Sequence, residues 1–196
     1  MESALIALRE EPDRCKRIIE DSLPQRLEEV RAWATVGVHG LWFGQWLSSA
    51  DVISEADYLE LVYPTDQIII EAMRAAGLIP FYHFCGEVIP RLKHIMRYKP
   101  TVLGVEEPKK GLHLDIGAIR AAVGAEVCLL GNIDVYGVVE KGTPEEWAKE
   151  VERQIGAAGP RRFIVSCGSP ITHDTSPWRL RDFIRTAQKV RDSWTQ

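Results

Sequence analysis

The sequence predicts a parallel α/β fold, and three observations support this prediction. Five short apolar runs alternate with amphipathic segments along the 196 residues. Nearly continuous apolar runs of this kind are typical of parallel strands that are covered on both faces. The later runs each end in Gly, Pro, Asn or a polar residue, and helix start signals lie between them. The regular alternation of strand and helix therefore places the chain in the parallel α/β class.

The first predicted elements are a helix and a strand. The helix covers residues 12–34 and is interrupted or restarted near Pro24, because proline removes a backbone donor. The run VGVHGLW then predicts the first strand over residues 36–42. Four further strands are predicted at residues 78–84, 101–106, 126–130 and 162–166.

The helices between these strands have recognisable first residues. Ser54, followed by acidic residues, predicts the start of the helix after the first strand, and Pro64 predicts a bend in it. Thr143 and Glu146 have the spacing of a capping box, with a proline at the first helical position between them. The last helix is predicted to open at Pro177.

Composition and charge exclude several classes of protein. The chain has 45% hydrophobic and 27% charged residues, which is typical of a globular domain. Its 28 acidic and 24 basic residues are spread without a basic face, which argues against a nucleic-acid partner. The first residues lack the pattern of a signal peptide, and no apolar run reaches the length of a membrane span. We therefore expect a cytoplasmic protein with no membrane or nucleic-acid partner.

The number of strand–helix units leaves two architectures open. A closed barrel of eight strand–helix units takes about 250 residues, and this sequence provides about five units. Either the sheet is open and doubly wound, or the chain is part of a barrel. Such a barrel would be completed by another polypeptide or would lack its N-terminal portion.

His83 and Cys85 lie two positions apart at the end of the second predicted strand. Residues two apart point to the same side of a strand, and α/β folds carry active sites at the carboxyl ends of their strands. Cys167 follows the last predicted strand and is expected at the same end of the sheet. One imidazole and two thiolates would leave zinc an open fourth position, as in catalytic zinc sites. The alternative for His83 and Cys85 is a buried histidine beside a small apolar cysteine.

Three further polar residues are candidates at this end of the sheet. Glu106 directly ends the third predicted strand and is favoured over Glu107 as a fourth ligand or as a partner of a ligand. Asn132 and Asp134 occupy the loop after the fourth strand, where they could bind substrate or could cap a helix or turn. No catalytic residue is predicted beyond the metal site.

An apolar cluster lies at the end of the first predicted strand. It consists of Trp42, Phe43, Trp46 and Leu47. Such a cluster could form a wall of a substrate pocket, a docking surface for a partner, or part of the core.

Several distinct short motifs lie along residues 47–192. They are ISE at 53–55 with LVYP at 61–64, LGNID at 130–134, GTPEE at 142–146, and Ile171 with DTSP at 174–177. Together they resemble the C-terminal portion of the uroporphyrinogen decarboxylase superfamily, while the residues before 47 fit more loosely. Because members of that superfamily are (β/α)8 barrels, the resemblance implies a partial TIM-like barrel whose N-terminal units are missing. It also implies a single domain over residues 1–196.

The resemblance further implies an activity. One branch of the superfamily consists of zinc enzymes that move a methyl group from a methylated corrinoid protein to coenzyme M or tetrahydrofolate. Those enzymes carry a His-x-Cys and a later Cys, and His83, Cys85 and Cys167 match this pattern. Decarboxylases carry Gly-His-Gly after the last strand, where this sequence has GSP at 168–170. The resemblance thus implies a zinc-dependent methyltransferase whose corrinoid is supplied by a partner protein. Glu106 stays a further candidate ligand because of its place at the end of the third strand.

Two other functions stay open at this point. One is a decarboxylase-like lyase that acts on a tetrapyrrole. The other is a non-catalytic, truncated subunit, because five units cannot close a barrel and leave open strand edges exposed. Such a subunit would need an N-terminal partner chain or would associate with copies of itself.

Overall fold

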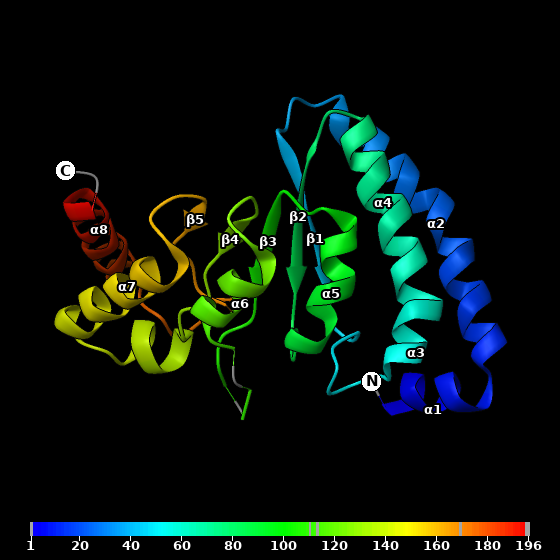
Figure 1. The fold of residues 1–196 in the computed structure, drawn as a ribbon, viewed down its shortest axis with the longest axis horizontal. Helices are drawn as coiled ribbons and strands as arrows, with labels where there is room; N and C mark the ends of the chain where they lie inside the picture. Colours follow the sequence, from blue (N-terminus) through cyan, green and yellow to red (C-terminus); the bar gives the residue numbers. More distant parts are fainter. Residues whose placement is uncertain (1, 110, 113, 169, 195–196) are drawn as a thin grey trace.

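A five-stranded parallel sheet forms the centre of the molecule. The computed structural model describes residues 2–109, 111–112, 114–168 and 170–194. The strands follow one another in the order β1-β2-β3-β4-β5, and helices flank them (Figure 1). A doubly wound sheet reverses its strand order at one point, whereas the wall of a barrel keeps the sequential order. The fold is therefore α/β and corresponds to part of a TIM-like barrel.

Four of the five strands lie within the predicted runs. They are β2 (Ile79–Phe84), β3 (Val102–Val105), β4 (Cys128–Leu130) and β5 (Phe163–Ile164). The first prediction is wrong in position, since β1 covers Gly40–Gln45 rather than residues 36–42. Gly37 has a φ of +79° and turns the chain after the preceding helix, so residues 36–39 form a connection.

The N-terminal helices differ from the prediction. A short helix, α1 (Glu2–Glu10), precedes the predicted one, and α2 (Pro12–Ala34) runs through Pro24 as one continuous helix. The predicted interruption is therefore wrong. Proline removes one helical hydrogen bond, but Pro24 lies on the exposed side of α2. Water can bond the carbonyl that is left free there, which keeps the cost of the missing bond low.

The helical segment after β1 begins at Ser54, as predicted. Its capping box with Asp57 opens α3 (Glu55–Asp57), which continues as a π-helical stretch (Tyr58–Val62) into α4 (Tyr63–Ala75). The π-helical stretch ends at Val62, and Pro64 lies in the first turn of α4, where proline is tolerated. The predicted bend at Pro64 stays a prediction.

The later helices follow their start signals. Between β2 and β3, α5 (Leu92–Ile95) lies between two 3₁₀ turns, Ile89–Arg91 and Met96–Tyr98. The segments after β3 and β4 are α6 (Ile116–Val123) and a π-helical segment (Val135–Glu140). The predicted capping box of Thr143 and Glu146 opens α7 (Pro144–Ala158), and α8 (Pro177–Trp194) ends the described chain. None of the helices in the described residues combines the length and the apolar character needed to cross a membrane.

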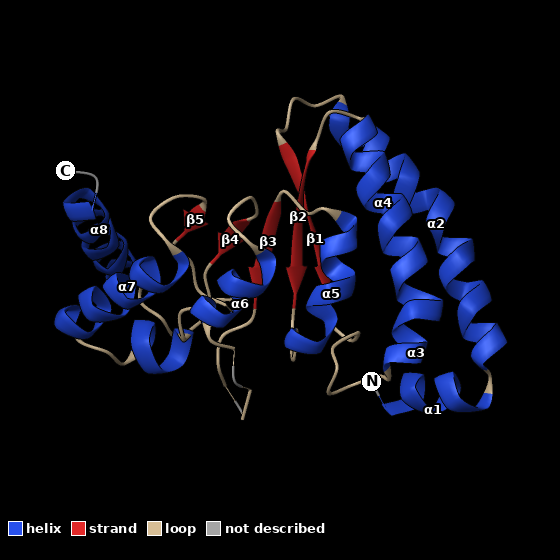
Figure 2. Ribbon diagram, in the orientation of Figure 1, coloured by secondary structure: helices blue, strands red, loops and turns tan. Residues whose placement is uncertain are grey.

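The two faces of the sheet have different surroundings. On one face, Tyr82, Phe84 and Leu103 are fully buried in the main hydrophobic cluster. The alternate side chains, among them Trp42 and His83, point to the other face, and Trp42 is 56% exposed. Figure 2 shows α2 and α4 at the β1 end of the sheet and α7 and α8 at the β5 end. The less covered face and the two sheet edges are therefore where binding can occur.

Candidate functional site

All four predicted metal-binding residues line one cavity of about 660 Å³. His83 lies on β2, Cys85 directly follows β2, and Glu106 directly follows β3. Cys167 lies beyond β5 and pairs with Ile133 in an isolated parallel bridge. The carboxyl ends of the strands thus bring to one cavity residues that are far apart in the sequence.

The other walls of the cavity are mostly apolar. Besides Lys109, Ser166 and Gly168, they include Trp42, Trp46, Val165, Pro170, Ile171, Leu180, Phe183 and Ile184. The predicted apolar cluster is therefore divided, because Trp42 and Trp46 line the cavity while Phe43 packs against the core. Apolar walls lower the local dielectric constant and strengthen the electrostatic interactions of the polar groups among them.

His83 is held between an aromatic ring and a glycine. Its ring centroid lies 4.7 Å from that of Trp42, and a Cβ at Gly104 on the neighbouring strand would collide with Nδ1. Burial lowers the pKa of His83, which favours the neutral imidazole that binds metals. Within the described residues, Nδ1 of His83 is buried without a hydrogen-bond partner. Such an atom is rare in proteins, and a bound group could satisfy it.

The thiols of Cys85 and Cys167 are protonated in these surroundings. Burial raises the pKa of Cys85 to about 12, and the negative charge of Glu106 acts in the same direction. Burial raises the pKa of Cys167 to about 11, and Glu107 and Asp134 add to this effect. A divalent cation bound in the cavity would instead lower the pKa of both thiols, because a coordinated thiol is deprotonated.

Glu106 is fixed at the wall of the cavity. Its Oε2 accepts a hydrogen bond from the N–H of Gly86 at 3.1 Å, and the ammonium of Lys109 lies 2.6 Å from Oε1. Gly86 has a φ of +79° and packs against Ser49, so that a side chain at position 86 would collide with the Ser49 hydroxyl. The segment after Cys85 is therefore held by Glu106 on one side and by Ser49 on the other.

Glu107 serves a different purpose from Glu106. It is 4% exposed, and its Oε2 accepts a hydrogen bond from the N–H of Val135 at 3.0 Å. Gly168 lies so close to the Glu107 backbone that a side chain at 168 would collide with it. Glu107 thus links the end of β3 to the loop after β4, and Glu106 is the glutamate that lines the cavity.

Asn132 and Asp134 are engaged in the framework below the cavity. Asn132 is 1% exposed, donates to the carbonyl of Leu114 at 2.7 Å and accepts from Nε2 of Gln154 at 3.0 Å. Asp134 accepts from the first backbone N–H groups of the π-helical segment. Asp134 thus has the capping role that the sequence left open, whereas Asn132 joins distant segments instead of capping a helix or turn. Substrate binding by either residue stays a prediction.

The predicted ligands fit zinc by their chemistry. A neutral imidazole, two thiols and a carboxylate border one cavity, and these are the donor types of zinc sites. In the part of the chain that the structure describes, no three His, Cys, Asp or Glu side chains are already gathered as a metal cluster. Ser169, in the tripeptide that replaces the decarboxylase motif, lies outside the described residues.

Three residues that shape the site were missed from the sequence. Gly86 and Gly104 leave room for Ser49 and His83, and Lys109 pairs with Glu106. A glycine inside an apolar strand marks a close approach of another group, so Gly104 could have been found by that signal. Lys109 lies three residues after Glu106 in a loop, where the sequence gives no comparable signal.

Comparison with known proteins identifies one family. The sequence profile described as "Uroporphyrinogen decarboxylase (URO-D)" matches residues 1–190. The match includes α1, α2 and β1, so it extends further toward the N-terminus than the motifs from residue 47 onward suggest.

Individual relatives are distant and longer. The "Methylated-thiol--coenzyme M methyltransferase" of Methanosarcina mazei is 22% identical over 80% of this chain and 40% of its own length. Uroporphyrinogen decarboxylases of Thermodesulfovibrio yellowstonii and Chlorobaculum tepidum are 26% and 29% identical, over 84% and 71% of this chain and 45% and 38% of their own lengths. The chain thus spans less than half the length of these curated relatives.

A solved structure confirms the fold. The structure titled "methyltransferase from Methanosarcina mazei" superposes on 100% of this chain with a TM-score of 0.83 and 15% sequence identity. The superposition covers 54% of that protein. The architecture is therefore that of about half of this longer protein.

Proposed function

Because the chain belongs to the uroporphyrinogen decarboxylase family, we propose that it is a zinc-dependent methyltransferase. It would move a methyl group from a methylated corrinoid protein to a thiol such as coenzyme M, or to tetrahydrofolate. The observation that carries this proposal is the single cavity bordered by His83, Cys85 and Cys167. Similarity to the methylated-thiol--coenzyme M methyltransferase of M. mazei supports the same kind of reaction.

His83, Cys85 and Cys167 would hold the zinc. Glu106 would be a fourth ligand, or would accept a hydrogen bond from a group bound to the metal. When bound, zinc supplies a strong positive charge that lowers the pKa of an acceptor thiol and so provides a nucleophile at neutral pH.

The residues of the chain itself would prepare the cavity for this reaction. Trp42 packs against the His83 ring, and the apolar walls would reduce the contact of a bound acceptor with water. Lys109 balances the charge of Glu106 and keeps its carboxylate at the wall. The corrinoid, which carries the methyl group, would come with a partner protein.

The proposal extends to assembly and location. The outer strands β1 and β5 each have a neighbouring strand on one side only, and an N-terminal partner chain or further copies of this chain would cover these edges. We propose the cytoplasm as the compartment.

The direct test uses methylcobalamin and 2-mercaptoethanesulfonate with the zinc-treated protein. We expect loss of the methylcobalamin absorbance and formation of the methylated thiol, detected by mass spectrometry. Cys167→Ser should lose this activity, whereas Cys15→Ser should keep it, because Cys15 lies on α2 and does not line the cavity. Tetrahydrofolate in place of the thiol tests the second acceptor.

Two results would contradict the proposal. One is a folded, zinc-treated protein, with its partner chain if it has one, that transfers no methyl group to either acceptor. The other is decarboxylation of uroporphyrinogen by the same protein, which would establish the lyase alternative.

A further inference from the structure

One wall of the cavity is built by the last helix. Leu180, Phe183 and Ile184 line the cavity from α8. Pro170 and Ile171 line it from the segment before that helix. Residues three and four positions apart lie on the same face of a helix, so the three α8 side chains form one continuous apolar strip. This strip borders the same cavity as the proposed zinc ligands.

The two cations beside Leu180 are engaged outside the cavity. The guanidinium of Arg179 lies over the Trp147 ring of α7, 4.8 Å from its centroid. That of Arg181 lies over the exposed Trp178 ring, 4.5 Å from its centroid. Neither arginine is among the described residues that line the cavity. The α8 wall therefore presents alkyl and aromatic groups, while the charged side chains that flank it in the sequence bind elsewhere.

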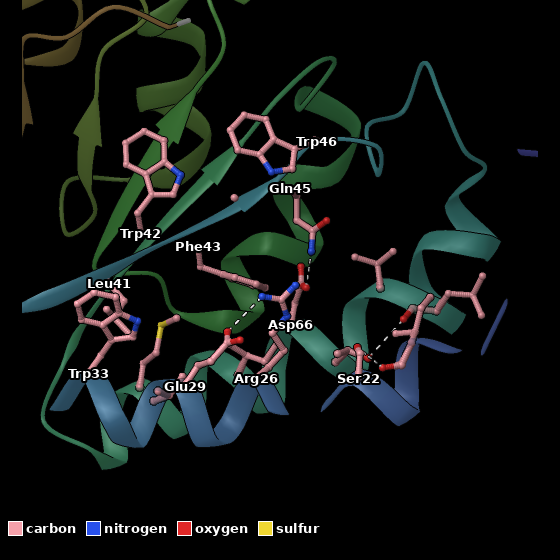
Figure 3. Close-up of a pocket in the computed structure, with 18 residues that line it drawn as sticks. Ser22, Arg26, Glu29, Trp33, Leu41, Trp42, Phe43, Gln45, Trp46 and Asp66 are labelled. Carbon is pink, nitrogen blue, oxygen red and sulfur yellow. Dashed lines mark hydrogen bonds and ion pairs between the residues drawn. The ribbon is translucent and has the colours of Figure 1, made fainter. Parts of the chain in front are cut away.

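Two tryptophans add aromatic surface to the cavity. Trp42 and Trp46 project from the same side of the first strand, opposite to Phe43 (Figure 3). Both indoles lie against Gly44, since a Cβ at this position would come within 3.0 Å of Trp46 and 3.1 Å of Trp42. The ring centroid of His83 lies 4.7 Å from that of Trp42 and 6.2 Å from that of Trp46. The tryptophans thus offer flat apolar surface directly beside a proposed zinc ligand.

The charges at the cavity wall balance one another. Of the described residues that line the cavity, Glu106 and Lys109 are charged near neutral pH. The Lys109 ammonium lies 2.6 Å from Glu106 and 3.6 Å from Glu107, so it already has two carboxylates as partners. Zinc held by two thiolates and an imidazole would add no net charge. An anionic ligand would lose water of hydration against the apolar wall without meeting a surplus of positive charge.

We propose that the cavity selects an acceptor thiol with an uncharged, apolar body, such as an alkanethiol. The α8 wall and the two tryptophans would bind this body, with the sulfur toward the proposed zinc ligands. This inference rests on the proposed function and narrows its acceptor. The thiol proton would pass to solvent, an S–C bond would form to the methyl group, and the Co–C bond of the methylated corrinoid would break with both electrons left on cobalt. Coenzyme M, which carries a sulfonate, would be a poorer acceptor.

Binding of the product thioethers to the full chain, without added zinc, tests this proposal. Methyl ethyl, methyl propyl and methyl butyl sulfide are compared with the anion 2-(methylthio)ethanesulfonate by ligand-observed NMR. We expect the affinity to rise about fourfold with each added methylene group, because each is removed from water at the apolar wall. Methyl butyl sulfide should bind at least about tenfold more tightly than the sulfonate. This measurement requires neither zinc nor methyl transfer.

A matched pair of lysine substitutions on α8 provides the second measurement. Ile184 and Trp178 are both apolar and exposed, at 46% and 66%, but Ile184 lines the cavity and Trp178 does not. Ile184→Lys should reduce the preference for methyl butyl sulfide over the sulfonate at least about tenfold, because a cation replaces part of the apolar wall. Trp178→Lys should leave this preference unchanged. Circular dichroism of both variants checks that the fold is kept.

Three outcomes would overturn the acceptor proposal: binding of the sulfonate as tight as that of the uncharged thioethers, an affinity that does not rise with chain length, or no binding of any thioether. A methyl-transfer assay separates these results from a failure of the proposed function. Faster methylation of 2-mercaptoethanesulfonate than of 1-butanethiol would remove only the acceptor proposal. Binding that rises with chain length, in a zinc-treated protein that transfers no methyl group, would remove the proposed function and leave the preference of the cavity for apolar ligands.

Discussion

The amino and carboxyl ends of the strands differ in how their polar groups are used. Near the amino ends of β4 and β5, the guanidinium of Arg120 donates to four carbonyls, those of Gly124, Val127, Ala158 and Arg162, at 2.7 to 2.8 Å. At the carboxyl ends, Nδ1 of His83 lacks a partner in the described part of the chain, and two thiols have raised pKa values. One end joins elements of the fold, and the other keeps reactive groups in an apolar cavity.

This difference separates stability from function within one sheet. A group whose hydrogen bonds are all made within the protein contributes to folding, and its loss leaves several acceptors unpaired. A buried group without a partner is a cost to folding and gains its partner from a ligand. Substitutions at the two ends should therefore affect different measurements.

The largest effect on stability is expected from Arg120→Met. Four carbonyls would lose their donor, which should lower the free energy of unfolding by about 3 to 4 kcal/mol. Urea unfolding followed by circular dichroism measures this change. Zinc content at a temperature where the variant is folded should equal that of the parent, and a large drop in zinc with unchanged stability would break the distinction between the two ends.

A smaller effect of opposite sign is expected from Asp66→Asn. Asp66 is 2% exposed and accepts hydrogen bonds from Tyr82 at 2.7 Å and from Gln45, the last residue of β1, at 2.6 Å. Burial raises the pKa of Asp66 to about 7, with the phenols of Tyr58 and Tyr98 nearby. The folded state therefore holds the Asp66 proton more tightly than the unfolded state does.

The pH dependence follows from this difference. Below about pH 4 both states are protonated, and between about pH 4 and 7 only the unfolded state ionises, so stability falls as the pH rises. Above about pH 7 the loss is complete. Asp66→Asn should flatten this part of the curve and be more stable than the parent at about pH 8, by about 1 to 3 kcal/mol. Chemical unfolding at a series of pH values measures this, and an unchanged slope would show that Asp66 is ionised throughout. Asp66 also lines a cavity of about 570 Å³ beside β1 (Figure 3), and the other charged residues that line this cavity are Arg26 and Glu29 on α2.

The smallest effect on stability is expected from Glu106→Gln. The amide keeps an oxygen that can accept from Gly86, but it removes the charge beside the proposed zinc and weakens the contact with Lys109, which keeps Glu107 as a partner. Zinc affinity should fall about 10- to 100-fold, as for other partners of metal ligands, while stability changes by less than about 1 kcal/mol. Competition with a chromophoric chelator measures the affinity. An unchanged affinity would show that Glu106 does not interact with the metal.

The sequence predicted the carboxyl-end cavity better than the sheet edges. His83, Cys85, Glu106 and Cys167 share one cavity because every parallel strand ends at the same side, and the runs that end there could be recognised. The start of β1 was misplaced because Gly37 ends the turn after α2 within an otherwise strand-like run. The predicted interruption of the helix at Pro24 was wrong because the cost of a proline depends on its exposure, and the side on which α2 packs is not visible in the sequence.

Other features depend on contacts between distant segments. Gly104 is needed because His83 lies across from it on the next strand, and Lys109 is placed by Glu106 and Glu107. None of these distances can be derived from local periodicity, whereas the helix starts at Ser54 and Thr143 could be, since their hydrogen bonds are formed within four residues.

Zinc content tests the central claim most directly. The purified chain is incubated with zinc, freed of excess metal and analysed by elemental mass spectrometry, together with Cys167→Ser and, as a control, Cys15→Ser. We predict about one zinc per chain in the parent and in Cys15→Ser, and markedly less in Cys167→Ser, because zinc with only two strong ligands is weakly held. A folded parent that holds no zinc, or a Cys167→Ser variant that holds as much as the parent, would contradict the proposed metal centre.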